Sequence, residues 1–427
     1  MAEEADAGAA RGDNTGDTWV GIWGASPQPA AAGDLPPEPF TRDGRVLADA
    51  TLRQTLRVTA DTGLIRLRVT NAFGAAPLHV GRVSVALPDK GKAGVAEIEA
   101  GTARELTFAG QAATVVPPGA ETASDPIEFS GTAGANVTVT LWLPDGVHEA
   151  DGITTHAGSR TTSWVTPGDH VTDGALPGAE PVDHWYFLSG VDAQSGQGMA
   201  GAAATVVCLG DSLTDGRGST TNGNDRWPDQ LLDRLRTAEN TEGNANAVAF
   251  VNQGIGGNRV LADGLGPAIL SRLDRDVLAV PGVRWLIVYA GVNDIGMADA
   301  TSEAQQQVAA DLCNAYENIA LKARAAGLKV YGATLTPFGG NDPYDDAAIT
   351  GKGTTGSGGH REAARQSVNA WIRAGGAFDA VLDFDAAVRH RGAKRRLAER
   401  FDEGDHLHLS PAGYQSLAAA VPSEIFH

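Results

Sequence analysis

Residues 203–216 read AATVVCLGDSLTDG and decide the fold of the C-terminal half of the chain. Residues 203–209 form a short apolar run with β-branched side chains, which is typical of a buried strand. A strand that stops at Gly-Asp-Ser places Ser212 at its carboxyl end, where open α/β sheets bind their ligands. The motif differs from the Gly-x-Ser-x-Gly nucleophile elbow, because Thr214 stands in the place of the second glycine. Ser212 is therefore the candidate nucleophile.

A histidine near the C-terminus supplies the base that a serine nucleophile needs. Residues 405–414 read DHLHLSPAGY. Asp405 can turn back and hold one imidazole nitrogen of His408, which leaves the other nitrogen free to face Ser212. The Ser-Pro pair that follows is typical of a helix start, with serine as the N-cap and proline at the first helical position. Asp405 and His408 are the predicted partners of Ser212, and His406 is the alternative base.

Two segments that contain glycine and asparagine follow two further apolar strands. Residues 248–259 read VAFVNQGIGGNR, and residues 285–294 read WLIVYAGVND. Glycine lets a backbone N–H approach a substrate closely, and an asparagine side chain can donate a second hydrogen bond. One such donor to a tetrahedral oxyanion is worth about 3–4 kcal/mol in the transition state. Parallel strands would bring both segments to the sheet edge that carries Ser212.

These four segments, in this order, resemble the four blocks of the SGNH (also called GDSL) hydrolase superfamily. The resemblance covers roughly residues 201–427, and four blocks together are much more specific than any one of them. It implies acyl transfer to water through a Ser-His-Asp triad, with no metal and no organic cofactor. The implied triad is Ser212, His408 and Asp405, and the implied oxyanion hole is Ser212, Gly257 and Asn293, with Gly256 replacing Gly257 if the register differs by one.

Shorter phrases narrow the resemblance to a bacterial subgroup of two-domain esterases, in which a β-rich domain precedes the SGNH domain. Members of this subgroup are often exported, and some relatives remove acetyl groups from plant polysaccharides. The resemblance therefore implies a secreted or periplasmic serine esterase for short-chain, acetyl-type carboxylic esters, with a small ester or an acetylated carbohydrate as substrate. The phrases are residues 226–228 (RWP), 336–340 (TPFGG), 368–372 (VNAWI) and 383–385 (DFD).

The pattern of the chain changes close to residue 200. Before it, short segments alternate apolar and polar residues between turn signals, which predicts a β-sandwich-like domain over residues 18–195. After it, apolar strands alternate with amphipathic helices at 301–326 and 360–374, which predicts an α/β domain over residues 201–427. The SGNH resemblance implies a flavodoxin-like three-layer sandwich with a parallel sheet for this domain. The alternating segments are residues 52–58, 64–69, 82–87 and 137–143.

The two ends of the β-rich domain have their own composition. Residues 1–17 are rich in Ala, Glu, Asp and Gly, which predicts disorder. They lack the basic start and the apolar centre of a signal peptide. Either the protein is intracellular or the sequence begins after a removed signal, and the subgroup resemblance favours the second. Residues 195–198 read SGQG, which predicts a linker.

The charge of the chain limits its partners. A formal net charge of −19 argues against binding to nucleic acid or to an anionic membrane, because phosphate groups would be repelled. No apolar run approaches the length that crosses a bilayer, so we expect no membrane insertion. Asp383 and Asp385 could join Asp405 in a metal site, but capping or loop-bracing explains carboxylates better when no ligand histidine lies near in the sequence.

The proposed site residues and the function each have an alternative. Ser212 could be only a helix N-cap, Asn293 a turn residue and Gly257 a position that needs a positive φ. A broader arylesterase, a lipase-like enzyme or a thioester hydrolase would use the same triad, and a catalytically weak carbohydrate-binding protein would keep only the fold. The loops that should border the site, residues 217–225 and 339–359, are polar and rich in glycine, which predicts a short acyl chain.

Overall fold

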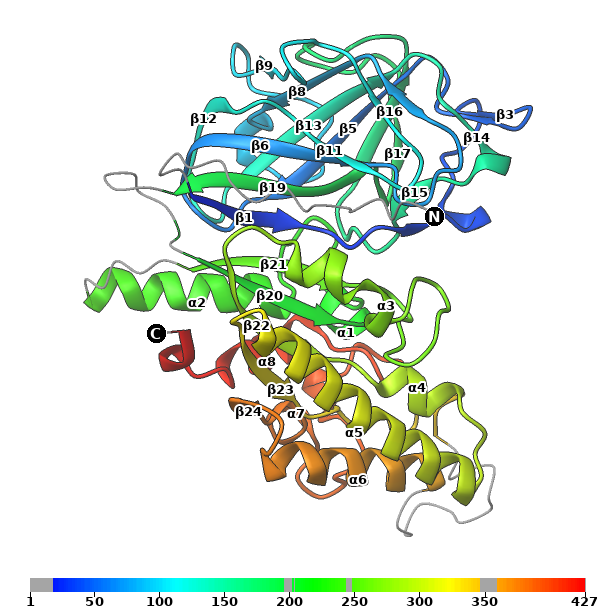
Figure 1. Cartoon of the computed structure of the whole chain (residues 1–427), viewed down its shortest axis with the longest axis vertical. Helices are drawn as coiled ribbons and strands as arrows, with labels where there is room; N and C mark the ends of the chain where they lie inside the picture. Colours follow the sequence, from blue (N-terminus) through cyan, green and yellow to red (C-terminus); the bar gives the residue numbers. More distant parts are fainter. Residues whose placement is uncertain (1–17, 196–201, 203, 243–247, 346–358, 427) are drawn as a thin grey trace, which may run out of the picture.

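The chain divides into a strand-rich part, residues 18–195, and an α/β part, residues 204–426 (Figure 1). The predicted disordered segment 1–17 and residues 196–198 of the predicted linker lie outside the described residues. None of the helices in the described ranges is long and apolar enough to cross a membrane. The structure is a computed structural model that describes residues 18–195, 202, 204–242, 248–345 and 359–426.

The α/β part is built on a parallel sheet in the order β21-β20-β22-β23-β24. Its first strand in sequence, β20, lies between the second and the third, which is the flavodoxin-like order. Every residue of β20 is buried, as expected where both faces of a parallel sheet are covered. This confirms the predicted α/β class. The strands are β20 (Ala204–Gly210), β21 (Val248–Gly254), β22 (Val283–Tyr289), β23 (Lys329–Ala333) and β24 (Ala380–Leu382).

Two groups of helices accompany this sheet. The long helix α5 packs with α3, α4 and α6, whereas α8 packs with α2 and α7 (Figure 1). The amphipathic pattern predicted helices at 301–326 and 360–374, and the structure confirms both as α5 and α6. The helices are α1 (Ser212–Asp215), α2 (Trp227–Glu242), α3 (Ile269–Leu273), α4 (Val292–Met297), α5 (Ser302–Ala325), α6 (His360–Ala374), α7 (Phe384–Val388) and α8 (Pro411–Ala419).

The strand-rich part contains two main antiparallel sheets whose buried side chains share one core. One sheet has the order β1-β19-β6-β11, with β12 also paired to β6, and the other has the order β17-β16-β5-β13-β8-β9. The predicted alternating segments are found as β5, β6, β8 and β13, which confirms the expected antiparallel, strand-rich architecture. The strands of the first sheet are β1 (Thr18–Gly24), β6 (Thr62–Thr70), β11 (Glu121–Ala123), β12 (Ile127–Gly131) and β19 (Leu188–Ser195).

The remaining strands complete the second sheet and three small ones. The second sheet consists of β5 (Ala50–Arg57), β8 (Arg82–Ala86), β9 (Arg104–Glu105), β13 (Asn136–Leu143), β16 (Ser163–Pro167) and β17 (Glu180–Val182). The small sheets have the orders β14-β4-β3, β18-β15-β2 and β10-β7. Their strands are β2 (Gln28–Pro29), β3 (Thr41–Arg42), β4 (Arg45–Val46), β7 (Leu78–Val80), β10 (Thr114–Val116), β14 (Val147–His148), β15 (Thr154–His156) and β18 (Trp185–Tyr186).

Strand β1 lies against the edge strand β21 and joins the two parts (Figure 1). The amide of Gly21 donates to the carbonyl oxygen of Pro281 over 2.8 Å, and the amide of Phe250 donates to Thr59 Oγ1 over 3.0 Å. A Cβ at Gly21 would lie only 2.9 Å from Val280 Cγ1, so glycine permits this close approach. The contacts cover an edge that the parallel sheet would otherwise expose.

Asp211 lies between β20 and α1 and is the N-cap residue of α1. Its Oδ1 atom accepts a hydrogen bond from the amide of Leu213 over 3.0 Å, and Ser212 is the first residue of the helix, so the alternative of Ser212 as an N-cap is wrong. Among the described residues, the Oδ2 atom of Asp211 is buried without a hydrogen-bond partner. Burial raises the pKa of Asp211 to about 7; the Leu213 amide opposes this rise, and the nearby carboxylate of Asp294 adds to it.

Replacement of Asp211 by asparagine should change how stability depends on pH. The folded protein holds the carboxyl proton more tightly than the unfolded chain, in which aspartate titrates near a pKa of about 3.9. The contribution of this group to the free energy of unfolding should therefore fall from about pH 4 to about pH 7 and stay constant above that range. Asp211→Asn keeps an acceptor for Leu213 and does not titrate. Its free energy of unfolding, relative to that of the unsubstituted protein, should therefore rise by up to about 4 kcal/mol between about pH 4 and about pH 7. Urea unfolding from pH 4 to pH 8.5 measures this, and a pH-independent difference would contradict it.

Candidate active site

The structure brings Ser212, His408 and Asp405 together. Ser212 begins α1 at the carboxyl end of β20, and its Oγ atom lies 2.8 Å from His408 Nε2. His408 Nδ1 lies 2.6 Å from Asp405 Oδ2 on the other side of the ring. Because a carboxylate can only accept, Nδ1 carries a proton, and the Nε2 lone pair faces the serine hydroxyl. This arrangement can remove the proton from Ser212.

The loop that carries His408 is held by its own backbone. Asp405 Oδ1 accepts hydrogen bonds from the amides of Leu407 and His408, over 2.9 Å and 2.8 Å. Partial burial opposes the charge of Asp405, but the His408 ring and these two amides hold its pKa well below the usual range of aspartate. Ser410 caps α8 through the amide of Gly413, with proline at the first helical position, as the sequence predicted.

His406 faces a different carboxylate. Its Nδ1 atom lies 2.6 Å from Asp402 Oδ2, and half of its side chain is exposed. Its backbone has a φ of 66°, in the left-handed region, which turns the chain at this residue. The structure therefore places His408, and not His406, against Ser212.

The three predicted oxyanion donors line one cavity. This cavity has a volume of about 500 Å³, and Ser212, Gly257, Asn293 and the alternative Gly256 are all found in its wall with His408. Gly257 has a φ of 67°, so a glycine suits this position whatever its role, whereas Gly256 has no such constraint.

The side-chain amide of Asn293 is oriented by two neighbours. Its Oδ1 atom accepts from the hydroxyl of Tyr344 over 2.9 Å, and its Nδ2 atom donates to the carbonyl oxygen of Asn258 over 2.8 Å. Nδ2 carries two hydrogens, and the bond to Asn258 uses one of them. The second hydrogen is the one that could reach a substrate oxygen. Asp294 beside it accepts from the amides of Val260 and Leu261 and so braces the same loop.

A buried arginine whose role was not predicted from the sequence joins the segments around Ser212. Arg272 lies in α3, and only 1% of it is exposed. Its surrounding sequence, residues 269–276 (ILSRLDRD), resembles an exposed amphipathic helix, so no motif marks it. Its guanidinium donates to the carbonyl oxygens of Gly210 (3.0 Å) and Gln253 (2.9 Å), to Asn258 Oδ1 (2.9 Å), to Ser26 Oγ (2.7 Å) and to Asp276 Oδ2 (2.9 Å).

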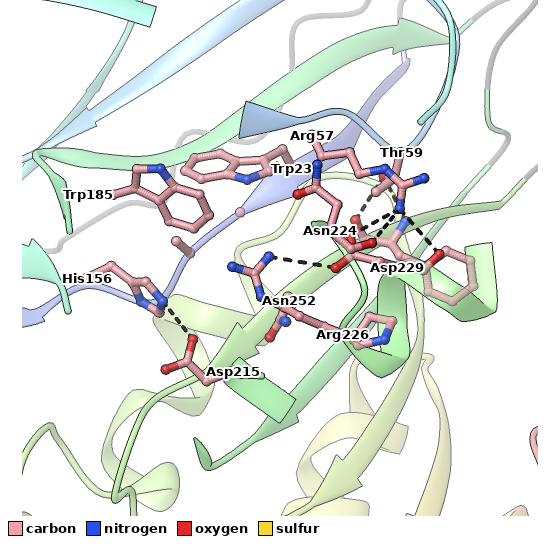
Figure 2. Close-up of a pocket in the computed structure, with 14 residues that line it drawn as sticks. Trp23, Arg57, Thr59, His156, Trp185, Asp215, Asn224, Arg226, Asp229 and Asn252 are labelled. Atoms are coloured by element: carbon pink, nitrogen blue, oxygen red, sulfur yellow. Dashed lines mark hydrogen bonds and ion pairs between the residues drawn. The ribbon is translucent and has the colours of Figure 1, made fainter. Parts of the chain in front are cut away.

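A second, much smaller cavity lies where the two parts meet (Figure 2). Its volume of about 30 Å³ is on the scale of one or two water molecules. In Figure 2, His156 of the strand-rich part points at Asp215 of α1, and their Nε2 and Oδ1 atoms are 2.9 Å apart. The His156 ring also stacks on Trp185, with centroids 5.6 Å apart. Asp215 borders both cavities, so the strand-rich part contacts the helix that begins with Ser212.

Asp383 and Asp385 have structural partners. Asp383 caps α7 by accepting from the amide of Ala386 over 3.1 Å. Asp385 is fully buried and pairs with three arginines. Within the described ranges, no group of three or more His, Cys, Asp or Glu side chains is arranged to hold a metal ion. The arginine partners of Asp385 are Arg365 (2.7 Å), Arg373 (2.6 Å) and Arg389 (2.6 Å).

Comparisons with known proteins identify the family of the α/β part. No curated protein matches the chain. Similar solved structures include a GDSL-like lipase from Bacteroides thetaiotaomicron VPI-5482, with 18% identity, a TM-score of 0.36, and coverage of 52% of this chain and 88% of that chain. They also include Axe2, an acetylxylan esterase from Geobacillus stearothermophilus, with 19% identity, a TM-score of 0.36, and coverage of 51% and 92%. Residues 208–416 match the model of the GDSL-like Lipase/Acylhydrolase family and form a domain of that family.

Proposed function

We propose that this protein is a serine ester hydrolase that cleaves short-chain, acetyl-type carboxylic esters. The observation that carries the proposal is the hydrogen-bonded series of Ser212 Oγ, His408 and Asp405, with distances of 2.8 Å and 2.6 Å, beside a cavity. Such a series activates a hydroxyl, because the imidazole takes its proton while the carboxylate stabilises the imidazolium that forms. The acylhydrolase family of residues 208–416 supports the same reaction class.

The proposed reaction is acyl transfer to water in two halves. His408 takes the Ser212 proton as the hydroxyl oxygen attacks the ester carbonyl carbon, and the carbonyl oxygen becomes an oxyanion. The N–H groups of Ser212 and Gly257 and the Nδ2 atom of Asn293 donate to this oxyanion. His408 then gives the proton to the leaving alcohol, and an acyl group stays on Ser212. Water repeats the same steps on the acyl-enzyme, which releases the acid and restores the serine.

We propose an acetylated carbohydrate as the natural substrate class and an exported, secreted or periplasmic location. Both rest on the resemblance to exported two-domain esterases. We further propose that residues 18–195 and 201–427 are two domains, of which the second carries the triad. The separate cores of the strand-rich and α/β parts support this division.

Ser212→Ala should abolish ester hydrolysis and leave the fold intact. A triad nucleophile acts as a unit with its base, so its loss should lower kcat by about 10⁶. Hydrolysis of p-nitrophenyl acetate measures the activity, and circular dichroism and the unfolding midpoint monitor the fold. Ser302→Ala, at an exposed position on α5, is the matched control and should keep full activity. More than a trace of activity in a clean Ser212→Ala preparation would remove Ser212 from its proposed role.

The two histidines of the last block should differ strongly. His408→Ala should lose as much activity as Ser212→Ala, because it removes the group that faces the hydroxyl. His406→Ala should lose less than about tenfold, because this histidine pairs with Asp402 and not with Ser212. Asp405→Asn should fall between them, with a loss of about 10⁴, since it disturbs the tautomer and orientation of His408. The reverse ranking of the histidines in a kcat/KM comparison would show that the register of this block is wrong.

Activity should be highest on acetyl or butyryl esters. Each buried methylene of a longer acyl chain is worth about 0.8 kcal/mol only where apolar walls receive it. The large apolar side chains around the cavity are few, and one of them, Leu265, is 63% exposed. A series of p-nitrophenyl esters from acetate to palmitate measures the preference. A kcat/KM maximum at eight or more carbons would indicate a lipase-like enzyme instead, and preferred turnover of acetyl thioesters would indicate a thioester hydrolase.

A further inference from the structure

The cavity beside Ser212 has two walls that come from different parts of the chain. The α/β part contributes Ser212, His408 and the oxyanion segments. The second wall belongs to the strand-rich part, in three segments that are far apart in the sequence: residues 28–34, 157–161 and 183–184. When the ester carbonyl of a substrate lies at Ser212, the other half of that substrate therefore contacts the strand-rich part. The polar residues of this second wall are Gln28, Asp34, Arg160, Thr161, Asp183 and His184.

Hydrogen bonds fix this second wall relative to the nucleophile. His156, directly before the segment 157–161, lies 2.9 Å from Asp215 of α1, and both side chains are buried. Gln28 Nε2 donates to the carbonyl oxygen of Leu265 over 2.9 Å, and both residues line the cavity. Arg272 Nη1 donates to Ser26 Oγ, two residues before Gln28. The wall is therefore part of the site and not a separately moving module.

His184 lines this cavity and has a ring nitrogen that can accept a hydrogen bond. Its Nδ1 atom lies 2.8 Å from the carbonyl oxygen of Ala157, which can only accept, so Nδ1 carries the proton and Nε2 keeps a lone pair. The ring is further held by edge-to-face packing on Tyr186, with centroids 6.1 Å apart. An acceptor on a ring with a fixed orientation can select a hydroxyl donor at a defined distance from Ser212.

Arg160 and two carboxylates add charge to the same wall. Arg160 donates through Nη2 to the carbonyl oxygen of Ser219, and its backbone has a φ of 51°, which is uncommon for a residue with a side chain. Asp34 is held by the amide of Ala31, and the carboxylate of Asp183 is exposed. The wall thus contains both hydrogen-bond donors and acceptors. Its two carboxylates outnumber its one guanidinium, so it carries no net positive charge.

We propose that this wall binds the alcohol half of the substrate and selects a neutral, hydroxyl-rich alcohol such as a sugar, with His184 and Asp183 as specificity-determining residues. The inference rests on the proposed ester hydrolase function. Hydroxyl groups both donate and accept, so a sugar can bond His184, the carboxylates and Arg160 together. An anionic alcohol would meet the two carboxylates and the net charge of −19, and an apolar alcohol would leave these polar groups without partners.

The test compares two acetyl esters that differ only in the alcohol. The full-length protein is assayed on a methyl xyloside monoacetate and on p-nitrophenyl acetate, whose alcohol offers no hydroxyl pattern. For His184→Phe, kcat/KM on the sugar ester, relative to kcat/KM on p-nitrophenyl acetate, should fall about tenfold, mainly through KM. Asp183→Asn, at an exposed position where folding is not at risk, should lower the same ratio about threefold or more. His79→Phe, an exposed histidine of the strand-rich part outside the cavity, is the matched control and should leave the ratio unchanged.

The outcomes separate this inference from the function on which it rests. If the unsubstituted protein turns over both esters and neither variant changes the ratio, the proposed alcohol-binding role of the wall is wrong. The proposed ester hydrolase function is then still supported. A parallel loss on both esters would also overturn it, because that result assigns the residues to the reaction and not to the alcohol. If the unsubstituted protein hydrolyses neither ester, the ester hydrolase itself fails. An unfolding midpoint for each variant shows that the compared proteins are folded.

Discussion

The buried guanidinium of Arg272 is the interaction on which the arrangement of the candidate site depends. It binds the last residue of β20 immediately before Asp211 and Ser212, the end of β21 at Gln253, and Asn258 in the oxyanion segment. Removing one partner of a buried charged network typically costs about 3–5 kcal/mol, because the groups left behind are unpaired in a medium of low polarity. A single side chain therefore holds the nucleophile and the oxyanion segment in register, and it does so with Ser26 of the strand-rich part as a further partner.

Much of the α/β part could be predicted from the sequence because its signals are local. Residues 360–374 form a helix with the predicted bounds, since their apolar positions recur at the helical period. Ser410 and Pro411 begin α8 because a cap needs only the residues beside it. The meeting of Ser212 with His408, 196 positions away, was predicted from the need of a serine nucleophile for a base and from the resemblance of four blocks to one superfamily. Periodicity alone specifies the strands and helices but not that pairing.

The features that escaped prediction depend on contacts between distant segments. Arg272 has the local sequence of a surface helix, and its burial follows from acceptors contributed by other strands and by the strand-rich part. The unpaired oxygen and the raised pKa of Asp211 follow from the helices and strands packed around it. The second wall of the cavity has no motif, because residues 28–34, 157–161 and 183–184 are adjacent only after the antiparallel sheets have formed. No spacing along the sequence indicates that these three segments become neighbours.

The position of β1 also has a consequence for the order in which the chain acquires its structure. β1 pairs with β19, from Thr18 opposite Ser195 to Gly24 opposite Gly190, so the strand-rich part closes with its own first and last strands. During synthesis these strands can pair before most of the α/β part has left the ribosome. As the parallel sheet forms, Phe250 of β21 bonds Thr59 of this folded surface, and Pro281, shortly before β22, bonds Gly21 of β1. The first half of the protein thus covers the β21 edge, whose unpaired backbone groups could otherwise pair with another chain.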